Sequence, residues 1–158
     1  MDTPRKPQAR GCAVAVAKRS AHFKWTAAHD QAFPEVVHGQ IPFGNQILIQ
    51  LRRPPDKVGN LLIPDETKAI EQSRMQIGVI RAVGPTAFRD QKDLTAWPEG
   101  DWAEPGDFVR IPQYGGDRAY VDAPEGDPVV MVLIKDLHLS ASVAGDPLLI
   151  KAYVAGGA

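Results

Sequence analysis

The sequence predicts an all-β domain, either a small barrel or a sandwich of short strands. Fourteen glycines and fourteen prolines interrupt the 158-residue chain too often for long helices. Between these residues lie short runs rich in valine and isoleucine, whose branched side chains favour strands over helices. A sheet protein built from short strands and tight turns is therefore expected.

Five runs are predicted as the principal strands. In Gln46–Leu51 the aliphatic Ile47, Ile49 and Leu51 alternate with the other residues, which is typical of a strand with one buried face. The last of the five contains no polar residue, so we expect it to be central in the sheet or buried on both faces. In chain order the five runs are Gln46–Leu51, 76–83, 108–112, 119–121 and 129–134.

The segment of about twenty residues before the third strand contains Trp97 and Trp102, separated by good turn residues. Two roles are open for these tryptophans. They line an opening at the roof of the molecule, or they pack against each other across a hairpin.

Both ends of the chain extend beyond the predicted strand domain, which spans residues 41–139. The N-terminal arm, residues 1–40, is basic in its first half and lacks sustained periodicity. Within it, residues 26–33 predict a short helix that ends at Pro34. The C-terminal extension, residues 140–158, contains one further predicted strand at 148–154.

Composition limits the kinds of partner. The net charge of −1 gives no general attraction to nucleic acid or to an anionic membrane. No apolar run approaches the roughly 18–20 residues that span a bilayer. A lone cysteine, Cys12, excludes an intrachain disulfide and agrees with a reducing compartment. We therefore expect a cytoplasmic protein that binds neither nucleic acid nor membrane.

No catalytic or metal-binding pattern is present in the sequence. The spacing of Cys12, His22, His29 and His38 is too irregular for an ordinary zinc site. The chain also lacks a Ser-His-Asp order, a P-loop and a dinucleotide fingerprint. The sequence therefore predicts a protein that is not an enzyme and needs neither a cofactor nor a metal.

One apolar cluster, Leu61, Leu62 and Ile63, lies in an otherwise polar segment between the first two strands. Loops are usually polar because they face water. Two interpretations are open: the cluster is a short core strand with Asp65 and its charged neighbours Glu66 and Lys68 on a surface turn, or it binds a partner.

The order and spacing of these pieces over residues 41–139 resemble the GroES-type co-chaperonin family. The resemblance covers roughly 60% of the chain and depends on several short matches, not on one diagnostic motif. The matching segments are Ile47-Leu48-Ile49, Gly59 with Leu61-Leu62-Ile63, residues 78–84, residues 105–109 and residues 130–137.

This resemblance implies an irregular β-barrel that assembles into a seven-membered ring and caps the folding cage of a chaperonin. It assigns chaperonin binding to Gly59, Leu61, Leu62 and Ile63. It also makes the protein a homo-oligomer whose partner is a large ring ATPase.

Three departures from the family pattern support an alternative function. The chain has Asn45-Gln46 where the family usually has Asp-Arg, the segment 84–106 is long, and both ends are extended. These features are typical of a divergent, for example phage-encoded, member. The alternative is a virion or assembly protein that keeps the barrel and uses residues 1–40 and 140–158 to join neighbouring subunits.

The energy of the apolar cluster favours multivalent binding. Burying each aliphatic side chain contributes about 1.5–3 kcal/mol, whereas ordering a loop residue costs about 1–2 kcal/mol. One copy should therefore bind weakly, and a ring of copies gains roughly 10²–10⁴ in avidity.

Overall fold

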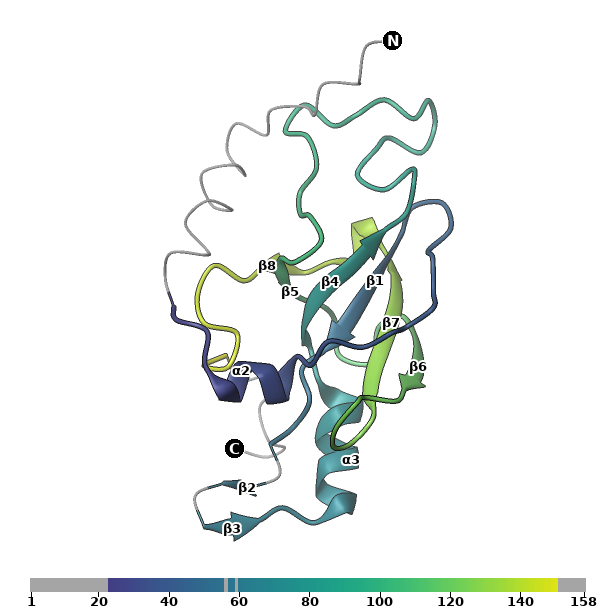
Figure 1. The fold of residues 1–158 in the computed structure, drawn as a ribbon. Coiled ribbons are helices and arrows are strands. Elements are labelled where there is room, and N and C mark those ends of the chain that lie inside the picture. Colours follow the sequence, from purple (N-terminus) through teal and green to yellow (C-terminus); the bar gives the residue numbers. More distant parts are fainter. Residues whose placement is uncertain (1–22, 56, 59, 151–158) are drawn as a thin grey trace.

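A computed structural model describes residues 23–55, 57, 58 and 60–150 (Figure 1). Its main element is an antiparallel sheet of six strands in the order β6-β7-β1-β4-β5-β8, and a separate two-stranded sheet joins β2 and β3. The all-β prediction is confirmed. The large sheet is open within the described residues, with β6 and β8 as its edges. Its strands are β1 (Gln46–Leu51), β4 (Ile77–Val83), β5 (Phe108–Arg110), β6 (Asp117–Val121), β7 (Val129–Lys135) and β8 (Ala141–Ser142).

All five predicted strands are present, with small shifts at their ends. β1 has the predicted bounds, and β7 is buried over most of its length because it lies between β1 and β6. The two-residue strand β8 was not predicted, since Ala141 and Ser142 carry no strand signal of their own. It forms by pairing with Val109 and Arg110 of β5.

The main core lies on one face of the sheet. Ile47, Ile49 and Leu51 of β1 are fully buried there, together with residues of β4, β5 and β7. A smaller cluster on the other face contains Leu48 and Met131. The sequence predicted one buried face for β1, and the structure buries the second face as well.

Residues 34–43, which we call the strap, pass over the second face, where Pro34 and Val36 contact it. The side-chain amide of Gln50, itself fully buried, donates from Nε2 to the carbonyl of Pro34 at 2.8 Å and accepts from Nε of Arg81 at 2.9 Å. Arg81 also lies 3.4 Å from the carboxylate of Glu35. Val36 packs against the smaller cluster, whereas Val37 is 95% exposed. The strap therefore fits the sheet through specific polar contacts.

The predicted short helix is confirmed as α2 (Ala27–Ala32). Its last residue, Ala32, and the following Phe33 belong to the main core. The described part of the predicted N-terminal arm therefore supplies core side chains to the sheet domain.

The predicted C-terminal strand is wrong over its described part. Residues 147–149 form a turn, residue 150 is a bend, and residues 151–154 lie outside the described residues. Asp146 starts this turn, because its backbone carbonyl accepts the N–H of Leu149 and its carboxylate accepts the N–H of Leu148. None of the described helices combines the length and apolar character that crossing a membrane requires.

Candidate functional site: an exposed apolar hairpin

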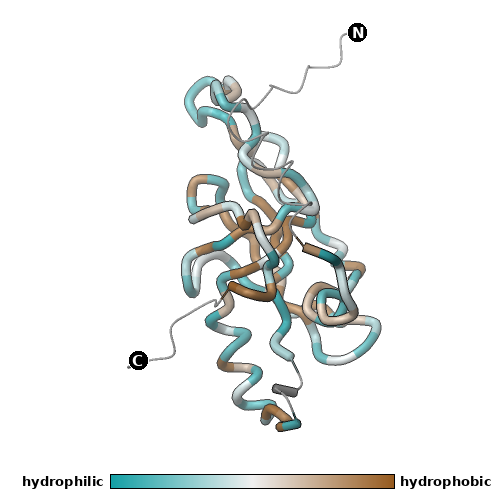
Figure 2. Tube along the Cα trace, turned by 90° about the vertical axis from the view of Figure 1, so that its left-hand side faces the viewer, coloured by the Kyte–Doolittle hydropathy of each residue, from teal (hydrophilic) through white to brown (hydrophobic). Residues whose placement is uncertain are grey.

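The apolar cluster of the loop begins within a small β-hairpin that projects from the sheet (Figure 1). β2 (Lys57–Val58) pairs antiparallel with β3 (Leu61–Leu62). Figure 2 shows hydrophobic residues at the far end of this projection, beyond a largely polar helix. Gly59, which the family resemblance assigns to binding, lies outside the described residues.

Two adjacent leucines of the hairpin face solvent. Leu61 is 76% exposed and Leu62 is 69% exposed, whereas Ile63 is half-buried. Successive side chains of a strand point to opposite faces, so neither face of β3 is covered by the body of the protein. Leu61 and Leu62 are thus strand residues, as one interpretation held, but they lie outside the core.

A ten-residue helix, α3 (Asp65–Arg74), returns the chain from the hairpin to the sheet. The sequence interpretation that placed Asp65, Glu66 and Lys68 on a surface turn is wrong. Pro64 occupies the N-cap, the two acids lie in the first turn and Arg74 in the last, an arrangement that favours a helix. These signals were present in the sequence and were outweighed there by the high overall proline content.

Trp97 and Trp102 lie against each other, as one of the two interpretations proposed. Their ring centroids are 6.3 Å apart and their planes nearly parallel, and Trp102 also packs against Phe88 at 5.6 Å. The indole N–H of Trp102 donates to Glu99 at 2.9 Å. Both tryptophans also pack against the main core.

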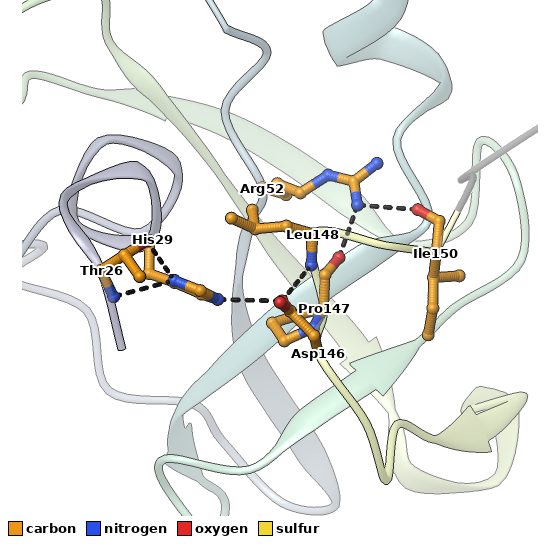
Figure 3. A network of polar contacts seen from close by, with 7 residues as sticks. All are labelled: Thr26, His29, Arg52, Asp146, Pro147, Leu148 and Ile150. Carbon is orange, nitrogen blue, oxygen red and sulfur yellow. Dashed lines mark hydrogen bonds and ion pairs between the residues drawn. The ribbon is translucent and has the colours of Figure 1, made fainter. Parts of the chain in front are cut away.

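A hydroxyl, an imidazole and a carboxylate meet where α2 approaches the C-terminal segment (Figure 3). The hydroxyl oxygen of Thr26 lies 3.0 Å from Nδ1 of His29, and Nε2 of His29 lies 2.9 Å from Asp146. The backbone N–H of Thr26 also donates to Nδ1, so Nδ1 is an acceptor and Nε2 carries the proton toward Asp146. His29 is only 2% exposed. This trio therefore caps α2 and holds the C-terminal segment, with the imidazole of His29 buried between the exposed Thr26 and the half-buried Asp146.

Arg52 holds the same segment from its other side (Figure 3). Its Nη1 group donates to the carbonyl of Pro147 at 2.5 Å and to that of Ile150 at 2.8 Å. Burial lowers the pKa of Arg52, and the nearby Glu71 and Asp146 oppose this shift. We call the contacts of His29 and Arg52 to residues 146–150 the C-terminal latch.

The remaining metal candidates do not converge in the described part of the chain. Cys12 and His22 lie outside it, while Nδ1 of His38 accepts the N–H of Gln40. His29 is part of the latch. Across residues 23–55, 57, 58 and 60–150, no group of three or more His, Cys, Asp or Glu side chains is placed to hold a metal ion.

Comparison of the chain with models of known protein families and with curated proteins finds no match. The exposed hairpin and the order of the elements that present it are therefore the features that bear on function.

Proposed function

We propose that the protein is a co-chaperonin of the GroES type, which forms a ring and caps a chaperonin folding cage. It acts by binding and carries no catalytic site. The observation that carries the proposal is the pair of exposed leucines, Leu61 and Leu62, at the end of a projecting hairpin. An apolar groove on a chaperonin subunit is the partner that this tip would fit.

A structured hairpin favours binding more strongly than the unstructured loop that the sequence suggested. Burying each leucine contributes about 1.5–3 kcal/mol. Because Leu61 and Leu62 are already paired with β2, less conformational entropy is lost on docking than for an unstructured loop. One site remains weak, and a ring presents several at once.

Self-association, which a ring requires, is supported by further exposed apolar side chains. Val37, Ile41 and Phe43 of the strap all point to solvent, and monomeric proteins rarely expose such residues close together. We include in the proposal that the six-stranded sheet corresponds to the irregular barrel of the family.

The same strap residues also favour the alternative, a virion or assembly protein whose subunits are joined by the two ends of the chain. The two functions differ in the hairpin, which has no role in the alternative. They differ as well in the arms, residues 1–40 and 140–158, which the alternative needs for assembly.

Replacing Leu61, Leu62 and Ile63 by serine tests the proposal. The matched control is Leu149→Ser, which removes a leucine that is 80% exposed and lies far from the hairpin in sequence. Native mass spectrometry with a double-ring chaperonin and ATP should show a bound ring for the wild type and the control, and a free ring for the triple variant.

Equal binding by the triple variant would reject the hairpin as the docking element. The absence of any ring in the wild type would reject the co-chaperonin. If a chain that lacks residues 1–22 and 151–158 and carries Val37→Ser still forms the wild-type assembly, the alternative is rejected.

A further inference from the structure

The segments that precede and follow the hairpin both contact one turn of the main sheet. Arg53 lies just after β1, where the chain leaves the sheet, and Lys68 lies on α3, which brings it back. Each donates to the turn between β6 and β7, which we call the 122–128 turn. In Figure 1 this turn lies beside α3.

Arg53, in the segment that leaves the sheet after β1, forms the first contact. Its Nη1 group donates to the carbonyls of Glu125 at 2.9 Å and Asp127 at 2.7 Å. Gly126 between them has a φ of 78°, and a Cβ there would lie 3.1 Å from that same Nη1. Glycine at this position thus lets the turn wrap closely around the guanidinium.

Lys68 forms the second contact, at the returning helix. Its ammonium lies 2.8 Å from the carboxylate of Asp127, and its side chain is only 14% exposed. The neighbouring Thr67, Ala69 and Ile70 are exposed. Lys68 also pairs with Asp65 at 3.2 Å, one helical turn closer to the hairpin. In the first half of α3, the side chain of Lys68 is therefore the one drawn toward the body.

Further contacts between α3 and the body of the protein lie at the far end of the helix. Gln72 donates to the carbonyl of Arg52, Arg118 donates to that of Ser73, and Met75 belongs to the core. At a rise of about 1.5 Å per residue, Lys68 lies about 9 Å along the helix from Arg74. A contact at that distance from the anchored end controls the angle of the helix.

We infer that Lys68 and Asp127 are positioning residues, which fix the angle of α3 and so the direction in which the leucine tip points. The effect on partner binding rests on the proposed function, whereas the effect on hairpin orientation does not. Breaking this ion pair leaves the leucines exposed and lets the tip sample a wider range of directions. Docking then costs more entropy.

Distance measurements by electron paramagnetic resonance test the orientation directly. Spin labels are attached at Asn60→Cys in the hairpin turn and at Ser140→Cys on the body, in a Cys12→Ser background. Labelled subunits are mixed with excess unlabelled ones, so that distances within one subunit are recorded. The variants are Asp127→Asn and Lys68→Met, and the matched control is Glu125→Gln. The control removes a charge from the same turn and keeps the carbonyl that Arg53 needs.

We expect a broader distance distribution in both variants and an unchanged one in the control. Chaperonin affinity per subunit should fall about two- to fivefold, the size of a partly exposed ion pair. The double variant should be no worse than either single one.

Distributions that match the wild type in both variants would overturn the inference. So would a broadened distribution with unchanged affinity, because orientation would then not govern binding. If the distribution broadens and the wild type itself binds no chaperonin, the positioning role stands and the proposed function fails.

Discussion

The buried carboxylate of Asp136 accepts the backbone N–H of Phe88 at 2.7 Å across 48 residues of sequence. It also accepts from the side-chain amide of Asn45 at 3.1 Å and from the N–H of Leu137 at 2.8 Å. Phe88 has a φ of 61°, which is rare for a residue with a large side chain. Asp136 thereby ties the end of β7 to the start of β1 and to the long segment before β5.

Asp136→Asn should lower the free energy of unfolding by about 1–3 kcal/mol. An asparagine keeps one acceptor oxygen and turns an NH₂ group toward N–H donors that need an acceptor. Urea denaturation measures the change. The control Asp122→Asn, at an exposed position after β6, should leave the urea midpoint unchanged. An unchanged midpoint in Asp136→Asn would contradict the assigned role.

Gln50→Met should loosen the strap. The substitution keeps the volume of the side chain and removes both hydrogen bonds, so that Arg81 and the carbonyl of Pro34 lose a partner. We expect about 1–2 kcal/mol less stability and faster hydrogen exchange over residues 35–43. Exchange at the wild-type rate in this segment would show that the apolar contacts of Val36 suffice.

Gly84→Ala should destabilise the protein by about 1–3 kcal/mol, because an added methyl group presses on backbone. A Cβ at Gly84 would collide with the carbonyl of Gly44 and lie 2.7 Å from that of Gln46. The matched control is Gly145→Ala, where a Cβ meets nothing within 4 Å. Thermal melts compare the two, and equal melting temperatures would argue against tight packing at Gly84.

Asp146→Ala and Arg52→Met should each release the C-terminal latch and speed hydrogen exchange over residues 143–150. Each removes contacts to the same short segment. The double variant should therefore lose less stability than the sum of the single losses, since the second change acts on a segment already freed. Strict additivity in urea melts would mean that the two contacts work independently.

Thr95→Val should raise the pKa of Asp93 toward its ordinary value of 3.8. The hydroxyl of Thr95 and then its N–H lower the pKa of this carboxyl. A carboxylate with a lowered pKa stabilises the fold above its unfolded-state value, and this contribution is lost as the pH falls through the folded-state value. Titration by nuclear magnetic resonance below pH 5 detects the change, and identical curves in both proteins would refute it.

The strands could be predicted from sequence because burial imposes a strong local pattern. Val129–Lys135 lacks polar residues along most of its length and proves to be internal. Alternating aliphatics likewise placed Gln46–Leu51 correctly. The weak two-residue β8 escaped prediction because its pairing with β5 is set by tertiary contact.

The second buried face of β1 could not be predicted from the strand itself. Glutamines alternating with aliphatics indicate a solvent-facing side, and Gln50 is buried only because the carbonyl of Pro34 and the guanidinium of Arg81 satisfy its amide. Those partners come from 16 and 31 residues away in the sequence. Only the folded chain brings them to the same place.

The apolar residues of the candidate site could be identified from the sequence, but whether they are buried or exposed could not. Leu61 and Leu62 stood out as aliphatic neighbours in a polar segment. The hairpin that presents them forms by local pairing with Lys57 and Val58, whereas the ion pair of Lys68 with Asp127 joins residues 59 positions apart. No local pattern encodes such a relationship.

The strap has a mechanical consequence. The hydrogen bond from the amide of Gln50 to the carbonyl of Pro34 fixes the register of the strap on the sheet. A shift by one residue would turn Val36 outward and carry this carbonyl out of reach. A pulling force on the N-terminal side of the strap first loads the His29 contact to Asp146 and the core packing of Ala32 and Phe33, and only then the contacts of Gln50 and Arg81. These contacts must therefore break before such a force reaches the hydrogen bonds of β1.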